Sequence, residues 1–115
     1  GYYEAHDVLE HIWLGSSGRV HDFYKALIQL AGAFVHMQLQ HTHPAHRVHG
    51  RRLRPAGRLL LRSADLLAPL PTDYAGVSVV DIRGLAEEWA GRLAATGHAE
   101  NPWSPERAPQ LALPV

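Results

Sequence analysis

The first fourteen residues, GYYEAHDVLEHIWL, concentrate carboxylate and imidazole side chains, the groups that bind divalent metals or move protons. Residues four positions apart share one face of a helix, so His6 and Glu10 lie one turn apart. Glu4 and Asp7 add two more carboxylates in the same turns. This pattern predicts either a reactive cluster or a set of side chains that satisfy one another.

A metal site in this region would draw ligands from two helices. A catalytic zinc ion takes about three protein ligands and leaves one position open. His6 and Glu10 would supply two ligands, and His36, on the next predicted helix, would supply the third. Glu4 or Asp7 would act as the catalytic base, with zinc or manganese as the divalent metal.

The alternative interpretation is a structural polar network. His36 and Gln29, on a largely buried helix, would then hydrogen-bond Glu10 or another carboxylate of the first helix. A buried polar group without a partner costs about 1–3 kcal/mol, so such a network fixes the register between two helices. The residues alone leave both interpretations open, and with them the question of whether the protein is an enzyme.

Four histidines cluster in a predicted loop over residues 41–50. They are His41, His43, His46 and His49. Their spacing suits adventitious binding of nickel or zinc, but the neighbouring arginines oppose a tight site for a cation. We therefore expect no physiological metal site in this loop.

A line of arginines follows the loop and faces outward on the next predicted helix. It comprises Arg51, Arg54, Arg58 and Arg62. Such a line could meet the phosphates of a nucleotide or RNA, although no interleaved aromatic residues and no helix-turn-helix pattern accompany it. The expectation is a solvated helix face, and anion or nucleic-acid binding is the alternative.

The composition describes one globular domain. The chain has 115 residues, of which 46% are hydrophobic and 19% charged, with nine histidines and no cysteine. The formal net charge of +0 argues against a protein built mainly to coat nucleic acid or an anionic membrane. No apolar run approaches the roughly 20 residues that span a bilayer, so we expect no membrane partner and a cytoplasmic location.

Apolar periodicity predicts an all-α fold, a compact bundle of four main helices. They cover about residues 2–14, 19–40, 51–67 and 79–95. The second helix carries two adjacent apolar stripes and is expected at the centre. The bundle is expected to occupy residues 1–97, and residues 98–115 form an irregular, Pro-rich tail that packs on the bundle or trails from it.

Local signals refine these elements. Gly32 costs roughly 1 kcal/mol relative to alanine inside a helix, so we expect another backbone to approach it closely. Pro55 suits the first turn of the third helix. Ser78 and Asp81 resemble a capping box before the fourth helix. Residues 73–76 (DYAG) predict a turn, and no segment alternates for long enough to predict a strand.

Four runs of sequence, taken in order, resemble the domain of unknown function 309 family. They are YYEAHDVLEHIW, FYKALIQLAGAFVH, PAGRLLLRSA and YAGVSV, and the resemblance covers about residues 1–95. Members of that family are small all-helical proteins, so the resemblance implies a helical bundle. It also implies a further short helix before Gly1.

The resemblance carries a functional label as well, that of a predicted metal-dependent hydrolase. Carried over by position, this label points to Glu4, His6, Asp7, Glu10 and His36. Family members commonly have glutamate where this chain has Asp7, and the shorter side chain reaches less far.

The sequence does not determine the function. The first hypothesis is a non-catalytic interaction or structural role, through a protein partner or a homo-oligomer. The alternatives are the metal-dependent hydrolase and the binding of an anion or nucleic acid through the arginine line, with nucleic acid the less expected partner.

Overall fold

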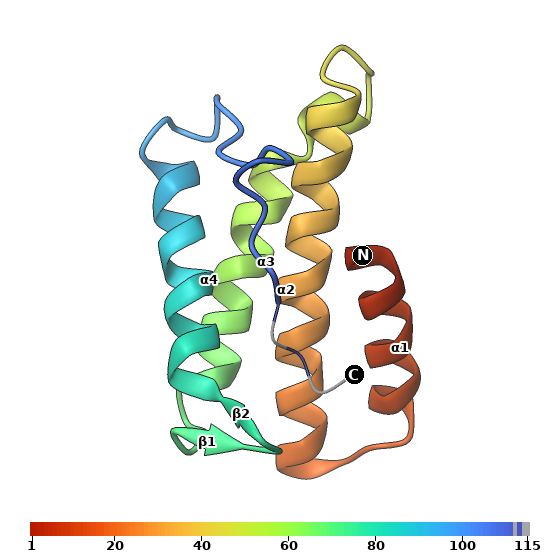
Figure 1. The fold of residues 1–115 in the computed structure, drawn as a ribbon, viewed down its shortest axis with the longest axis vertical. Coiled ribbons are helices and arrows are strands. Elements are labelled where there is room, and N and C mark those ends of the chain that lie inside the picture. Colours follow the sequence, from red (N-terminus) through yellow and green to blue (C-terminus); the bar gives the residue numbers. More distant parts are fainter. Residues whose placement is uncertain (112, 114–115) are drawn as a thin grey trace.

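The computed structural model describes residues 1–111 and residue 113, and four α-helices form its body (Figure 1). The helices are α1 (Tyr2–Leu14), α2 (Gly18–Thr42), α3 (Leu53–Leu67) and α4 (Val79–Ala94). A 3-10 turn, η1 (His49–Arg51), precedes α3, and two short strands, β1 (Asp73–Tyr74) and β2 (Val77–Ser78), precede α4. The four predicted helices and the all-α class are confirmed.

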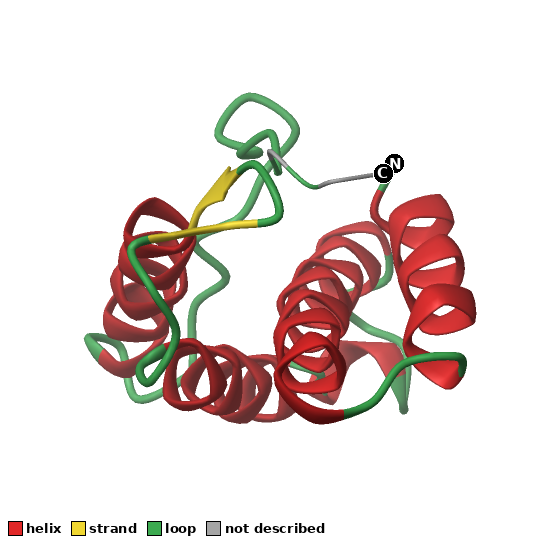
Figure 2. Ribbon diagram, turned by 90° about the horizontal axis from the view of Figure 1, so that it is seen from below, coloured by secondary structure: helices red, strands yellow, loops and turns green. Residues whose placement is uncertain are grey.

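Each helix packs on its neighbour in sequence: α1 on α2, α2 on α3, and α3 on α4. Seen end-on, the four helices form an arc with α1 and α4 at its two ends (Figure 2). The C-terminal segment, by which we mean residues 98–111, crosses the open side of this arc (Figures 1 and 2). The central position predicted for the second helix is confirmed, since α2 packs on both α1 and α3.

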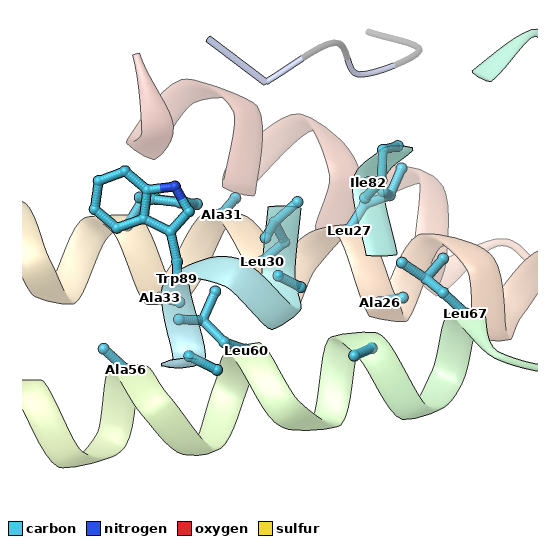
Figure 3. Close-up of a cluster of buried hydrophobic side chains, with 14 of the residues drawn as sticks. Ala26, Leu27, Leu30, Ala31, Ala33, Ala56, Leu60, Leu67, Ile82 and Trp89 are labelled. Atoms are coloured by element: carbon cyan, nitrogen blue, oxygen red, sulfur yellow. The ribbon is translucent and has the colours of Figure 1, made fainter. Parts of the chain in front are cut away.

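The concave side of the arc holds the core. Leucines and alanines of α2 face Leu60 of α3, and Ile82 and Trp89 of α4 complete the cluster (Figure 3). Ser63 is the buried polar residue of the described chain, and its hydroxyl donates to the Ala26 carbonyl at 2.8 Å. This bond joins α3 to α2, so Ser63 has a structural role.

Aromatic rings connect the two ends of the arc. The Tyr2 ring of α1 stacks on Phe34 of α2 at 5.3 Å, and Phe34 meets Trp89 of α4 edge-on at 5.2 Å. Trp103, only 6% exposed, comes from the C-terminal segment, and its Nε1–H donates to the Tyr2 hydroxyl at 3.3 Å. That hydroxyl in turn donates to the Pro109 carbonyl at 2.9 Å. The segment is therefore tied to α1 across the open side.

The β1–β2 hairpin was not predicted, and its size explains why. Asp73 pairs with Ser78 and Tyr74 with Val77, so each strand has only two residues and no period can be read from it. Ala75 and Gly76 both have positive φ, as a two-residue hairpin turn requires. The predicted cap of α4 is confirmed, because the Ser78 hydroxyl accepts from the Asp81 N–H at 3.3 Å.

The expectation for Gly32 was wrong. No backbone approaches it; a Cβ placed there would lie 3.5 Å from Leu59 Cδ1 and 3.7 Å from His6 Cδ2. Helical spacing puts Gly32 on the side of α2 that points away from the core, which is the convex side of the arc. Side chains of α1 and α3 thus meet above this residue.

Replacing Gly32 by alanine should raise the free energy of unfolding by up to about 1 kcal/mol, because both contacts are of ordinary van der Waals length and alanine favours the helix. Urea unfolding measures the change. Gly84→Ala in α4 is the matched control, since a Cβ there meets nothing within 4 Å. A Gly32→Ala protein less stable than wild type would show that His6 and Leu59 cannot accommodate a methyl group.

Candidate anion-binding surface

The acidic cluster of α1 is loose and solvated. His6 Nδ1 lies 3.9 Å from both Glu10 Oε2 and Asp7 Oδ1, beyond hydrogen-bond distance, and the two carboxylate side chains are 52% and 85% exposed. Glu4 is also exposed, and its Oε2 lies 3.1 Å from the Gly1 nitrogen. The structure therefore brings His6 and Glu10 near each other without joining them.

His36 faces α3 rather than the carboxylates of α1. Its Nδ1 lies 2.9 Å from Arg52 Nη1, and because a guanidinium only donates, the imidazole is the acceptor. Gln29 Oε1 is buried and has no hydrogen-bond partner among the described residues. The expected network, in which His36 and Gln29 would bond Glu10, was wrong in its partners.

The described residues do not fit a metal centre. No group of three or more His, Asp or Glu side chains in the described ranges could hold a metal ion. His6 and Glu10 supply two donors at most, while the Nδ1 of His36 is occupied by a cationic partner, Arg52.

The loop histidines lie close together, but their hydrogen bonds oppose metal binding. The rings of His46 and His49 are 4.4 Å apart, and that of His43 lies 5.6 Å from His49. His46 Nδ1 accepts from the N–H groups of Val48 and His49, and His49 Nδ1 accepts from Arg52 Nε at 2.7 Å. These bonds place the remaining proton of His46 and His49 on Nε2, where a metal would need a lone pair.

Positive charge gathers on α3 and on the loop before it. Residues 23–64 contain seven Lys and Arg side chains and no Asp or Glu. The four predicted arginines are all exposed. We call the following set the basic face: Lys25, Arg51, Arg52, Arg54, Arg58 and Arg62.

Carboxylates of the described residues do not pair with the basic face. None of its six side chains forms an ion pair with a carboxylate in the described part of the chain; the arginines that do are Arg83 and Arg92 of α4. Arg54 Nη2 donates to the Gly97 carbonyl at 3.4 Å, a neutral partner. The basic face therefore presents its positive charge to solvent.

A hollow of about 270 Å³ lies between α2 and α3 on this face. Lys25, Gln29, Arg62, Asp65 and Leu66 line it, and Asp65 supplies the carboxylate at its edge. Gln29, whose buried Oε1 has no hydrogen-bond partner among the described residues, is one of the residues that line this hollow.

The pKa shifts of His36 and His49 agree with their hydrogen bonds to Arg52. Burial lowers the pKa of His36, and the charges of Arg52 and Arg58 lower it further. Desolvation, Arg52 and the neighbouring loop imidazoles lower the pKa of His49. Both rings are therefore held neutral, in the form that can accept from Arg52.

The lowered pKa values predict that acid destabilises the protein. The unfolded chain takes up these protons near pH 6.5 and the folded chain only at lower pH, so stability is present above pH 6.5 and falls as pH drops through the folded pKa. Urea unfolding at about pH 7.5 and about pH 5.5 measures the loss. His36→Gln keeps an acceptor for Arg52 and removes one titration, so its dependence on pH should be shallower. Equal slopes for the two proteins would contradict the assignment.

Comparison with known families matches one part of the chain. The family model described as Domain of unknown function (DUF309) matches residues 1–48, which contain α1 and α2. The resemblance predicted from the sequence is confirmed over this part, and the match ends before α3. Searches of curated proteins and of solved structures find no match. The function of the matched family is unknown, so no activity is transferred from it.

Arg52 is the residue that sequence reasoning missed. It lies outside the i, i+4 line of outward arginines, and its contacts reach back to α2. Two signals in the sequence could have found the surface: the absence of acidic residues from 23 to 64, and the spacing of three between His49 and Arg52.

Within the described ranges, no helix combines the length and apolar character that a membrane span requires.

Proposed function

We propose that this chain is a non-catalytic binding protein whose basic face engages the phosphate backbone of a double-stranded nucleic acid. The observation that carries this proposal is the run of 42 residues, 23–64, with seven basic side chains and no acidic one. Arginines are suited to phosphate because the guanidinium donates two parallel hydrogen bonds to an oxyanion.

The spacing of the arginines supports an extended, repeating anion. Arg54, Arg58 and Arg62 follow each other at one turn of α3, about 6 Å apart along the helix axis. The helix is one of the four that form the arc (Figure 2), and its exposed arginines lie on the side opposite its buried residues, where an extended partner can run alongside it. A regular line of cations matches a regular line of phosphates better than it matches one small anion.

The absence of stacking residues favours a duplex over a single strand. Single-stranded nucleic acids are held by aromatic side chains on which the bases stack. Tyr3 of α1 is the exposed large aromatic side chain of the described residues, and it is not part of the basic face. Contacts would therefore go to the backbone, which positions a protein without reading sequence.

The formal net charge of +0 does not oppose this proposal. Charges at physiological ionic strength are screened over about 8 Å, whereas the longest axis of the molecule measures 40 Å. A partner on the basic face therefore interacts mainly with the nearby cations, and Asp65 is the carboxylate that lies beside Lys25 and Arg62.

The other expectations have no comparable support. The hydrolase stays a prediction without a fitting metal site among the described residues. A protein partner, a homo-oligomer and a cytoplasmic location likewise stay predictions.

Fluorescence anisotropy with a labelled DNA duplex of mixed sequence tests the proposal. The logarithm of the affinity should fall linearly with the logarithm of salt concentration, with a slope of about −4 to −5 for four to six neutralised phosphates. Duplexes of different sequence should bind equally well. No binding at about 50 mM salt, or a slope near zero, would refute the proposal.

A further inference from the structure

Arg52 is held in place by two imidazoles from different elements. Its Nε donates to His49 Nδ1 of η1 at 2.7 Å, and its Nη1 donates to His36 Nδ1 of α2 at 2.9 Å. A guanidinium has five N–H donors, so three remain, including both on Nη2. These three have no hydrogen-bond partner in the described part of the chain.

The partners of Arg52 leave its charge intact. A partly buried arginine is ordinarily paired with a carboxylate, which neutralises it. Arg52 is partly buried, and the acceptors it finds are neutral rings. A desolvated cation without a counter-ion is electrostatically costly, and an anion from outside the chain relieves that cost.

Each of the two imidazoles keeps one N–H donor, on the side of its ring away from the guanidinium. Because the Nδ1 atoms of His36 and His49 accept from Arg52, the proton of each neutral ring is on Nε2. Arg58 adds a second positive charge near His36, whose pKa it helps to lower. This part of the basic face therefore offers N–H donors and positive charge without a competing acid.

We infer that Arg52, positioned by His36 and His49, is the primary phosphate site of the basic face. The inference rests on the proposed function and names the residue that anchors the ligand. The ligand group is a single phosphate, bound by the free edge of the guanidinium. The exposed arginines of α3 lose side-chain entropy when they bind, whereas Arg52 is already fixed and loses less.

Titration with inorganic phosphate, followed by NMR of the arginine Nε–H and histidine side-chain signals, tests the site in the full chain. The Arg52 Nε–H and His36 Nε2–H signals should shift, with saturation at one phosphate per chain. Arg52→Gln should weaken phosphate binding about tenfold or more, the loss expected for charge-assisted hydrogen bonds. Arg19→Gln, at an exposed arginine of α2 outside the basic face, is the control and should weaken it less than about twofold.

Two further measurements keep the test decisive. Arg52→Lys retains the charge but not the two-pronged geometry, so it should not restore binding. Should Arg52→Gln fail to fold, the wild-type titration decides alone: shifts confined to the exposed arginines, with the Arg52 and His36 signals unmoved, overturn the inference.

The inference and the proposed function can fail separately. Suppose that the duplex affinity depends steeply on salt, but Arg52→Gln and Arg62→Gln weaken phosphate binding equally. This result would overturn the site and leave the proposed function standing. Phosphate binding that is lost in Arg52→Gln, with no binding to any duplex, would uphold the site and refute the function.

Discussion

A protein in which Arg51, Arg54, Arg58 and Arg62 are all replaced by glutamine should bind a DNA duplex about a hundredfold or more weakly at low salt. The four side chains are exposed and have no carboxylate partner among the described residues, so their removal costs the fold little. Each lost phosphate contact should reduce the salt slope by about one. Anisotropy titrations at several salt concentrations measure both effects.

The control for this experiment removes four arginines elsewhere. Arg19, Arg83, Arg92 and Arg107 lie outside residues 23–64, and replacing them by glutamine changes the net charge by the same amount. This variant should keep the wild-type salt slope. Equal losses in the two variants would mean that overall charge, and not the basic face, attracts the duplex.

Trp103→Ala should lower the free energy of unfolding by about 3–5 kcal/mol, the range for deleting a large buried aromatic side chain. The indole is 6% exposed and lies edge-on to Tyr2 at 6.3 Å. Its removal leaves a cavity and takes a hydrogen-bond donor from the Tyr2 hydroxyl. Against a typical total stability of about 5–15 kcal/mol, such a loss is severe. Urea unfolding followed by circular dichroism measures it.

Two companion variants separate the ring from its hydrogen bond. Tyr2→Phe removes the hydroxyl that bonds Trp103 and Pro109 but keeps the ring on Phe34, and should cost about 1–2 kcal/mol. Trp13→Ala removes a less buried tryptophan and should cost less than Trp103→Ala. A Trp103→Ala protein within 1 kcal/mol of wild type would show that the C-terminal segment does not pack on the helices in solution.

The helices could be predicted because their information is local. The two apolar stripes of α2 and the turn residues around each helix mark where the backbone must coil, whatever packs on it. The β1–β2 hairpin had no such signal, since strands of two residues have no period. The side chains that contact Gly32 could not be predicted from the sequence either. Periodicity shows which face of a helix is apolar, but not which side chains of other helices pack on a given residue.

The candidate surface was predicted only in part. Outward exposure of the arginine line follows from helical spacing, and the structure confirms it. The pairing of His36 with Arg52 depends on how the loop between α2 and α3 returns, and periodicity does not determine a loop path. The net charge of the whole chain also gave no sign of a basic surface, because equal numbers of acidic and basic residues can lie on different elements.

The order in which the helices pack has a consequence for folding. Because each helix contacts its neighbour in sequence, most of the arc assembles from short-range contacts, which form rapidly. The bonds from Tyr2 to Trp103 and Pro109 instead span 101 and 107 residues. Closing them carries the entropy of joining the two ends of the chain, so the C-terminal segment docks last and opens first. We therefore expect hydrogen exchange to be faster in this segment than in the helical arc beneath it.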